Sequence, residues 1–177
     1  SPLSLAQIDE VLLEIRKYNP DITFEKILLD TTGDIDLKTS LRTLDKTDFF
    51  TKEVDNLLLN KQCRIAVHSA KALPDPIKDG LQIVAITKGV DPSDSLVLQE
   101  GMTLDTLRQG AIIATSSIQR EETVKKLRSD LTFQDIRGTI GMRLEKLQLG
   151  LVDGVVIAEA ALFRLKLTHL NRIRLEG

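Results

Sequence analysis

Cysteine and histidine are scarce in this chain of 177 residues. It has one cysteine, Cys63, and two histidines, His68 and His169. A single cysteine excludes a disulfide within the chain and leaves no cysteine-based metal site. The histidines lie far apart in the sequence and lack the spacing of a metal-binding pair. We therefore expect no bound metal, and we expect a reducing cytoplasm as the location.

Aromatic residues and excess charge are also lacking. Aromatics make up 3% of the chain, with no tryptophan, and the formal net charge is −2. A base-stacking platform and a basic field, the two usual features of nucleic-acid binding, are both missing. No apolar run approaches the roughly 18 residues that a membrane span requires. We therefore expect a small-molecule partner, no nucleic acid and no membrane, and a monomeric protein.

The remaining pattern favours a globular α/β protein, because apolar runs typical of strands alternate with amphipathic, helical spacing. A helix beginning after a Ser4 cap is expected first. Together these features predict a largely parallel sheet. The Gly- and Pro-containing stretch 89–94 is the best candidate for a domain crossing, which gives domains 1–88 and 89–177. Strands are expected at 22–30, 63–70, 81–89, 111–117, 133–138 and 154–160, a turn at 31–36, and helices at 4–20, 51–62, 102–110, 118–130, 139–150 and, for the most part, 161–174.

Polar side chains follow several of the expected strands. In open α/β sheets, ligands bind beyond the carboxyl ends of the strands, so these residues are the candidate site. Hydroxyl groups at helix N-termini and arginines together suit carboxylates or phosphates. The candidates are His68, Ser69 and Lys71 after one strand, Thr115, Ser116, Ser117 and Arg120 after another, Arg137, Gly138, Thr139 and Arg143 after a third, and Arg164 after the last.

Structural roles remain open for each of these residues taken alone. "TSS" before a helix is commonly only an N-cap, and Arg143 could belong to a solvated helix face. His68 could be a structural histidine at a strand end, and Glu121-Glu122 complements a helix dipole. The coincidence of several strand ends, rather than any single residue, favours an anion pocket.

Longer motifs carry a resemblance to a known family. "FFTKEVDNLLLNKQCRIAVHSAKALP", "ATSSIQR", "DIRGTIGMRLEKLQLG" and "DGVVIAEAALFRLKL" stand in order along the chain. "SPLSLAQ" and "VDPSD" accompany them. Together these segments resemble the porphobilinogen deaminase (hydroxymethylbilane synthase) family of tetrapyrrole, or haem, biosynthesis, over nearly the whole chain.

The resemblance implies two periplasmic-binding-protein-like α/β domains with mainly parallel sheets and a ligand cleft between them. It implies a transferase that condenses four porphobilinogen units into hydroxymethylbilane with release of ammonia. The family builds this product on a dipyrromethane cofactor, thioether-linked to a cysteine in a third domain. Cys63 does not match that cysteine, so no covalent attachment to this chain is expected. The family's pyrrole-binding and carboxylate-binding positions match Ser1, His68, Ser69, Lys71, Thr115, Ser116, Ser117, Gln119, Arg120, Arg137, Gly138, Arg143 and Arg164.

The chain also departs from the family pattern. The resemblance gives Lys71 and Ala72 as the catalytic positions, but Ala72 stands where the family has an aspartate that assists proton transfer, and a methyl group loses general acid–base help of roughly 10²-fold or more. Asp75 and Asp94 are near enough in sequence to be considered as replacements. The family's first strand, the segment returning to the first domain and the third domain have no counterpart. Family cations are replaced at Thr47, Gly89, Ser93 and Gln119.

Three hypotheses follow from this pattern of matches and departures. The chain is a divergent porphobilinogen deaminase, or an inactive homologue that binds small carboxylate-bearing ligands. A small-anion-binding domain of the periplasmic type is a third interpretation, which rests on fold analogy alone.

Overall fold

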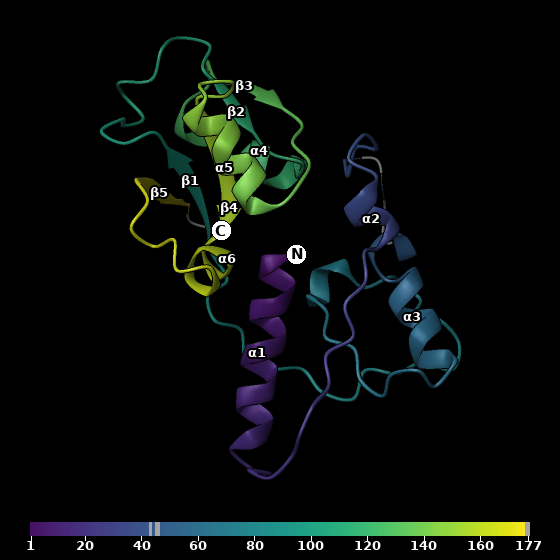
Figure 1. The fold of residues 1–177 in the computed structure, drawn as a ribbon. Coiled ribbons are helices and arrows are strands. Elements are labelled where there is room, and N and C mark those ends of the chain that lie inside the picture. Colours follow the sequence, from purple (N-terminus) through teal and green to yellow (C-terminus); the bar gives the residue numbers. More distant parts are fainter. Residues whose placement is uncertain (43, 45–46, 176–177) are drawn as a thin grey trace. The chain divides into compact units, whose positions relative to one another are not determined.

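The computed structural model describes residues 1–42, 44 and 47–175. The chain divides into two compact units (Figure 1). The first comprises Ser1–Thr39 and Leu44–Lys88, and the second comprises Ser40–Thr43 and Gly89–Gly177. The domain boundary at residues 88 and 89 stays a prediction, because compactness alone does not establish which parts fold independently.

The second unit is built on a mixed sheet. Its described strands are ordered β3-β2-β4-β1-β5. β2 pairs in parallel with β3 and β4, whereas β1 pairs antiparallel with β4 and β5. Every described strand except β1 therefore points the same way, as expected for a mainly parallel sheet. The strands are β1 (Asp94–Leu98), β2 (Ile112–Ala114), β3 (Thr132–Gln134), β4 (Gly154–Ala158) and β5 (Arg172–Leu175).

A helix follows each of the strands β2, β3 and β4 in this unit. They are α4 (Ile118–Leu127), α5 (Ile140–Gln148) and α6 (Glu159–Arg164). Hydroxyl caps begin the first two, because an N-cap oxygen accepts a backbone N–H that the helix leaves unpaired. The core lies between sheet and helices and includes the fully buried side chains of Leu96, Ile113, Val124, Val155 and Leu162.

The first unit holds α1 (Pro2–Arg16), α2 (Thr32–Ile35) and α3 (Lys52–Leu59), with 3-10 turns at Asp48–Phe50 and Ala70–Ala72. The cap of α1 is Ser1, not the predicted Ser4, because proline suits the first helical position and Pro2 occupies it. A short helix replaces the turn expected at 31–36, since Thr31 and Asp34 form a capping box. No helix in the described part of the chain has both the length and the apolar character to cross a membrane.

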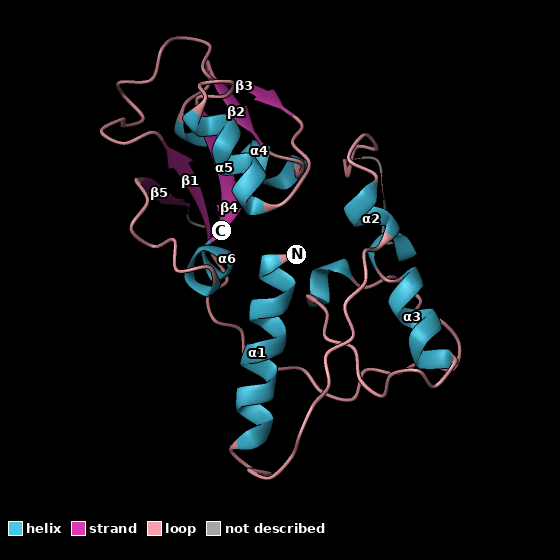
Figure 2. Ribbon diagram, in the orientation of Figure 1, coloured by secondary structure: helices cyan, strands magenta, loops and turns pink. Residues whose placement is uncertain are grey.

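The predicted strands at 22–30, 63–70 and 81–89 are wrong in this structure. Strands appear only in the second unit among the described residues (Figure 2). A strand needs a neighbour for its backbone hydrogen bonds and a core for one of its faces. These segments gain little burial, and Val84 and Ile86 are 74% and 80% exposed. Their apolar patterns were therefore not sufficient to form a sheet.

In the second unit one strand was not predicted, and two predicted helices differ from the structure. Residues 94–98 form the strand β1 between β4 and β5, where no strand was predicted. The predicted helix at 102–110 is a series of turns, flanked by Gly101 and Gly110 at positive φ. The long helix expected at 161–174 is wrong, because α6 ends at Arg164 and Lys166 has a φ of 58°. The chain then returns as the strand β5.

Candidate functional site

The candidate residues of the second unit gather at one edge of its sheet. The parallel strands β2, β3 and β4 place their carboxyl ends, Ala114, Gln134 and Ala158, at this edge. β1 runs the other way, and its first residue, Asp94, lies opposite Ala158. Residues that follow these strands therefore meet Asp94 at the position where such sheets bind ligands.

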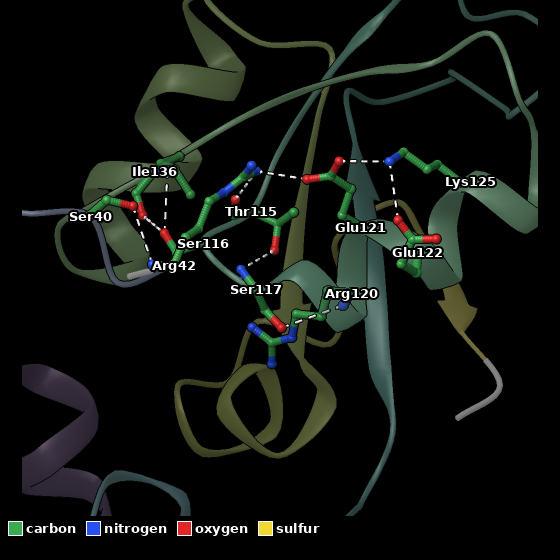
Figure 3. A network of polar contacts seen from close by, with 10 residues as sticks. All are labelled: Ser40, Arg42, Thr115, Ser116, Ser117, Arg120, Glu121, Glu122, Lys125 and Ile136. Atoms are coloured by element: carbon green, nitrogen blue, oxygen red, sulfur yellow. Dashed lines mark hydrogen bonds and ion pairs between the residues drawn. The ribbon is translucent and has the colours of Figure 1, made fainter. Parts of the chain in front are cut away.

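The hydroxyl side chains after β2 organise the start of α4 (Figure 3). Thr115 is buried, and its Oγ1 accepts from the backbone N–H of Ser117 at 3.2 Å. The Ser117 Oγ accepts from the Arg120 N–H at 3.4 Å, and the Ser116 Oγ bonds the Ile136 carbonyl after β3. Ser117 therefore has the N-cap role that the sequence allowed for "TSS". These hydroxyl side chains also fix the helix N-terminus beside the sheet edge, with Gln119 exposed in the first turn.

The start of α5 depends on Gly138, whose φ of 100° is a conformation that other residues rarely adopt. A Cβ on this glycine would come within 3.1 Å of Met142 side-chain atoms. Thr139 caps the helix by accepting from the Met142 N–H at 3.3 Å. The Arg143 Nε donates to the Gly138 carbonyl at 2.9 Å, so the arginine folds back toward the sheet edge.

Arginine side chains are crowded at this edge. Burial lowers the pKa of Arg143, and the positive charges of Arg120 and Arg137 lower it further, whereas Asp135 opposes the shift. A half-buried guanidinium beside two others is costly unless anions balance it. Arg120 already has such a partner, because its Nε and Nη2 donate to the Asp94 carboxylate at 2.9 and 2.5 Å. The arrangement favours binding of a further anion.

Arg164 and Glu159 extend the edge beyond β4. Both lie in α6, with Glu159 at its start and Arg164 at its end. Glu159 is buried, and hydrogen bonds from Arg172 and Ser95 hold the pKa of its carboxyl below the usual range, the Arg172 bond contributing most. Since Glu159 is engaged by protein partners, we assign it a structural role.

The structure adds residues 40–42 to this edge, which the sequence analysis missed. The Arg42 Nη2 donates to the Thr115 carbonyl at 3.0 Å and lies 3.0 Å from the Glu121 Oε2. Glu121 also pairs with Lys125 at 2.8 Å. No sequence pattern could have placed Arg42 here, because it lies outside any periodic segment and far from α4 in the chain.

The other candidate residues belong to the first unit. His68 is half-buried, and burial lowers its pKa while the nearby Asp55 opposes the shift. The Ser69 Oγ accepts from the Gln7 Nε2 on α1 at 2.7 Å. Ser1 caps α1.

Lys71 and Ala72 lie in the 3-10 turn Ala70–Ala72 of the same unit, Lys71 exposed and Ala72 half-buried. Of the two aspartates considered as replacements for the family's acid, Asp94 belongs to the second unit and is engaged by Arg120. Asp75 is exposed in the first unit.

A cavity of about 640 Å³ lies elsewhere on the second unit, near the carboxyl end of β1 and the end of α5. Leu98, Leu147 and His169 are among its lining residues. The side-chain amides of Gln99 and Asn171 in its wall donate to backbone carbonyls, so they are satisfied within the protein. The groups with anion chemistry are therefore at the opposite edge of the sheet.

Comparison with known proteins identifies the family of this chain. The family described as "Porphobilinogen deaminase, dipyromethane cofactor binding domain" matches residues 1–176. The chain belongs to the porphobilinogen deaminase family. It is 39% identical over 165 residues to a probable porphobilinogen deaminase of Pyrobaculum neutrophilum, and 38% identical over 165 residues to that of Pyrobaculum islandicum. These matches cover 93% of this chain but 56% and 55% of the relatives, so the chain spans about half of their length.

Proposed function

We propose that this chain binds the carboxylate side chains of porphobilinogen and of a dipyrromethane cofactor, as part of a porphobilinogen deaminase that makes hydroxymethylbilane. The observation that carries this proposal is the half-buried Arg143 beside Arg120 and Arg137 at the carboxyl edge of the sheet. Family membership over residues 1–176 supports the choice of ligand.

The ligand chemistry agrees with the donors at this edge. Each pyrrole unit carries an acetate and a propionate group, and arginine binds carboxylates through two parallel N–H donors. The capped N-termini of α4 and α5 add partial positive charge at the same edge. A polycarboxylate would therefore add negative charge beside the neighbouring guanidinium groups of Arg120, Arg137 and Arg143.

A dipyrromethane cofactor has the same acetate and propionate groups, so the donor set fits it. Arg120, Arg137 and Arg143 would hold these carboxylates. When bound, the cofactor supplies the pyrrole carbon on which the new chain is begun. Cys63 is a poor attachment point, because burial raises the pKa of its thiol and so disfavours the reactive thiolate. We therefore propose that any dipyrromethane on this chain is held without a covalent bond.

Calorimetric titration with porphobilinogen tests the proposed binding. The matched control ligand is 2-aminomethylpyrrole, which keeps the ring and the amine but lacks both carboxylates. We expect saturable binding of porphobilinogen and at least tenfold weaker binding of the control. Equal affinities, or no binding of porphobilinogen, would refute the proposal.

A specific observation favours the second candidate function, an inactive homologue that binds carboxylate ligands. Ala72 offers no proton acceptor in the 3-10 turn Ala70–Ala72. The test is turnover of porphobilinogen to uroporphyrin by the wild-type chain and by Ala72→Asp, with Ala70→Asp in the same turn as the control. Wild-type turnover would rule out the inactive homologue. Turnover gained only in Ala72→Asp would support it, and would indicate that the binding groups are intact.

The attachment of the cofactor has its own test. The intact mass of the chain purified from cells that make porphobilinogen should equal that of the bare polypeptide. An added mass corresponding to a dipyrrole would refute the non-covalent arrangement.

A further inference from the structure

Residues 40–42 contact the residues that follow two strands of the second unit, although the stretches that precede Ser40 and follow Thr43 belong to the first unit. Ser40 hydrogen-bonds the Asp135 side chain, which follows β3. The Ser40 Oγ also accepts from the Arg42 backbone N–H at 3.2 Å, which fixes the local turn. The segment is therefore held in place before the contacts of the Arg42 side chain are considered.

The Arg42 guanidinium joins two parts of the anion-binding edge (Figure 3). Its Nη2 donates to the carbonyl of Thr115, a residue 1% exposed, and also pairs with the Glu121 carboxylate. The Glu121 side chain is 15% exposed, and that of Arg42 is 26% exposed, so solvent screens this pair less than a surface pair. Thr115 directly follows β2 and Glu121 lies in the first turn of α4, so Arg42 bridges the turn between them.

We infer that Arg42 is a positioning residue of the anion site, and this inference rests on the proposed binding of carboxylates there. Arg42 fixes the Thr115 carbonyl relative to Glu121. The residues between them include Ser116, Ser117 and Arg120, which belong to the proposed binding edge. Because binding groups must be held close to their productive geometry, loosening this turn lowers the affinity without removing any ligand contact.

The chemistry of arginine suits this role. A guanidinium presents several donors in a rigid plane and can satisfy a carbonyl and a carboxylate together. Both contacts come from one nitrogen, Nη2, whose two N–H groups have fixed directions in the guanidinium plane. A lysine at the same position would keep the charge near Glu121 but would lose these fixed directions. The variant Arg42→Lys therefore separates the effect of charge from the effect of position.

The test uses the full chain and two probes, porphobilinogen and the simple tricarboxylate tricarballylate. Affinities are measured by calorimetry for the wild type, Arg42→Gln and Arg42→Lys. The control is Arg108→Gln, which removes an arginine–carboxylate pair with Asp153, near the opposite end of β2. Both glutamine variants lose an ion pair and should have lower thermal midpoints, whereas only Arg42→Gln should lose affinity, by about tenfold. Arg42→Lys should lose nearly as much.

The outcomes separate this inference from the proposed function. Unchanged affinity in Arg42→Gln would overturn the positioning role, and full affinity in Arg42→Lys would overturn it by showing that charge suffices. Binding of tricarballylate but not of porphobilinogen would refute the pyrrole ligand. The affinities of the wild type and the Arg42 variants for tricarballylate would then still test the positioning role. Failure of the wild type to bind either probe would overturn both. If Arg42→Gln does not fold, Arg42→Lys decides alone.

Discussion

Arg120 on α4 and Asp94 at the start of β1 form a two-point ion pair at the carboxyl edge of the sheet, with N···O distances of 2.9 and 2.5 Å. Their side chains are 19% and 30% exposed. The pair joins α4 to β1, the antiparallel strand between β4 and β5. It also places a protein carboxylate where an acidic ligand would otherwise meet Arg120.

The substitution Asp94→Asn should therefore lower the stability of the second unit and raise its affinity for porphobilinogen. Loss of the ion pair should reduce the unfolding free energy of the second unit by about 1 kcal/mol. Release of Arg120 from a competing carboxylate should tighten binding of porphobilinogen. Amide exchange of β1 and β4 measures the first effect and calorimetry the second. Glu122→Gln, at an exposed position of the same helix, should change neither, and weaker binding by Asp94→Asn would show that Asp94 orients Arg120 for the ligand.

Arg143→Gln should have the opposite combination of effects. The depressed pKa of Arg143 means that burial and two neighbouring arginines disfavour its charged form in the folded protein. Removing the charge should leave the stability unchanged or higher, while the affinity for porphobilinogen falls at least tenfold. Urea unfolding and calorimetry measure the two quantities. Unchanged affinity would place the ligand elsewhere.

The histidine of the first unit gives a pH prediction. Burial lowers the pKa of His68 below its ordinary 6.5, and Asp55 partly opposes this shift. A depressed pKa means that the folded state disfavours the proton, so His68 contributes stability above pH 6.5 that is lost as the pH falls through its folded value. Asp55→Asn should lower the pKa further, as measured by NMR titration of the imidazole C–H groups. Asp9→Asn, on α1 of the same unit, is the control, and a higher pKa in Asp55→Asn would contradict the arrangement.

Gly138 and Gly141 form a matched pair for testing whether the positive φ before α5 requires glycine. Gly138→Ala should destabilise the second unit by about 1–2 kcal/mol, because φ is 100° and the added Cβ meets Met142. Gly141→Ala should stabilise it by about 0.5–1 kcal/mol, since this helical position is open and alanine is the better helix former. Urea unfolding distinguishes these opposite signs. A neutral Gly138→Ala would show that the turn can adopt another conformation.

Sequence patterns predicted the second unit well where local and tertiary preferences agree. The segments that became β2, α4, β3, α5 and β4 each combine an apolar run with a cap or a glycine stop, so local preference and packing favour the same structure. The C-terminal segment did not follow this rule. Its apolar residues suited a helix, but residues 172–175 pair with β1 instead, and pairing partners are not visible in a local pattern.

The first unit shows the other limit. Its apolar segments, such as 81–89, have the composition of strands but lack a neighbouring strand in the described structure. Composition alone therefore predicted strands that do not form. At the site, the residues after each strand were predictable from the chain direction. The pairing of Arg120 with Asp94 and the contact of Arg42 with Thr115 were not, because each joins residues distant in sequence through the fold.

Backbone amide NMR during titration with porphobilinogen tests the central claim most directly, because it locates the ligand. The account predicts saturable shifts at Ser117, Arg120, Thr139 and Arg143, which lie at the carboxyl edge of the sheet. Shifts confined to the cavity near Leu98, Leu147 and Asn171, or no shifts at all, would contradict it.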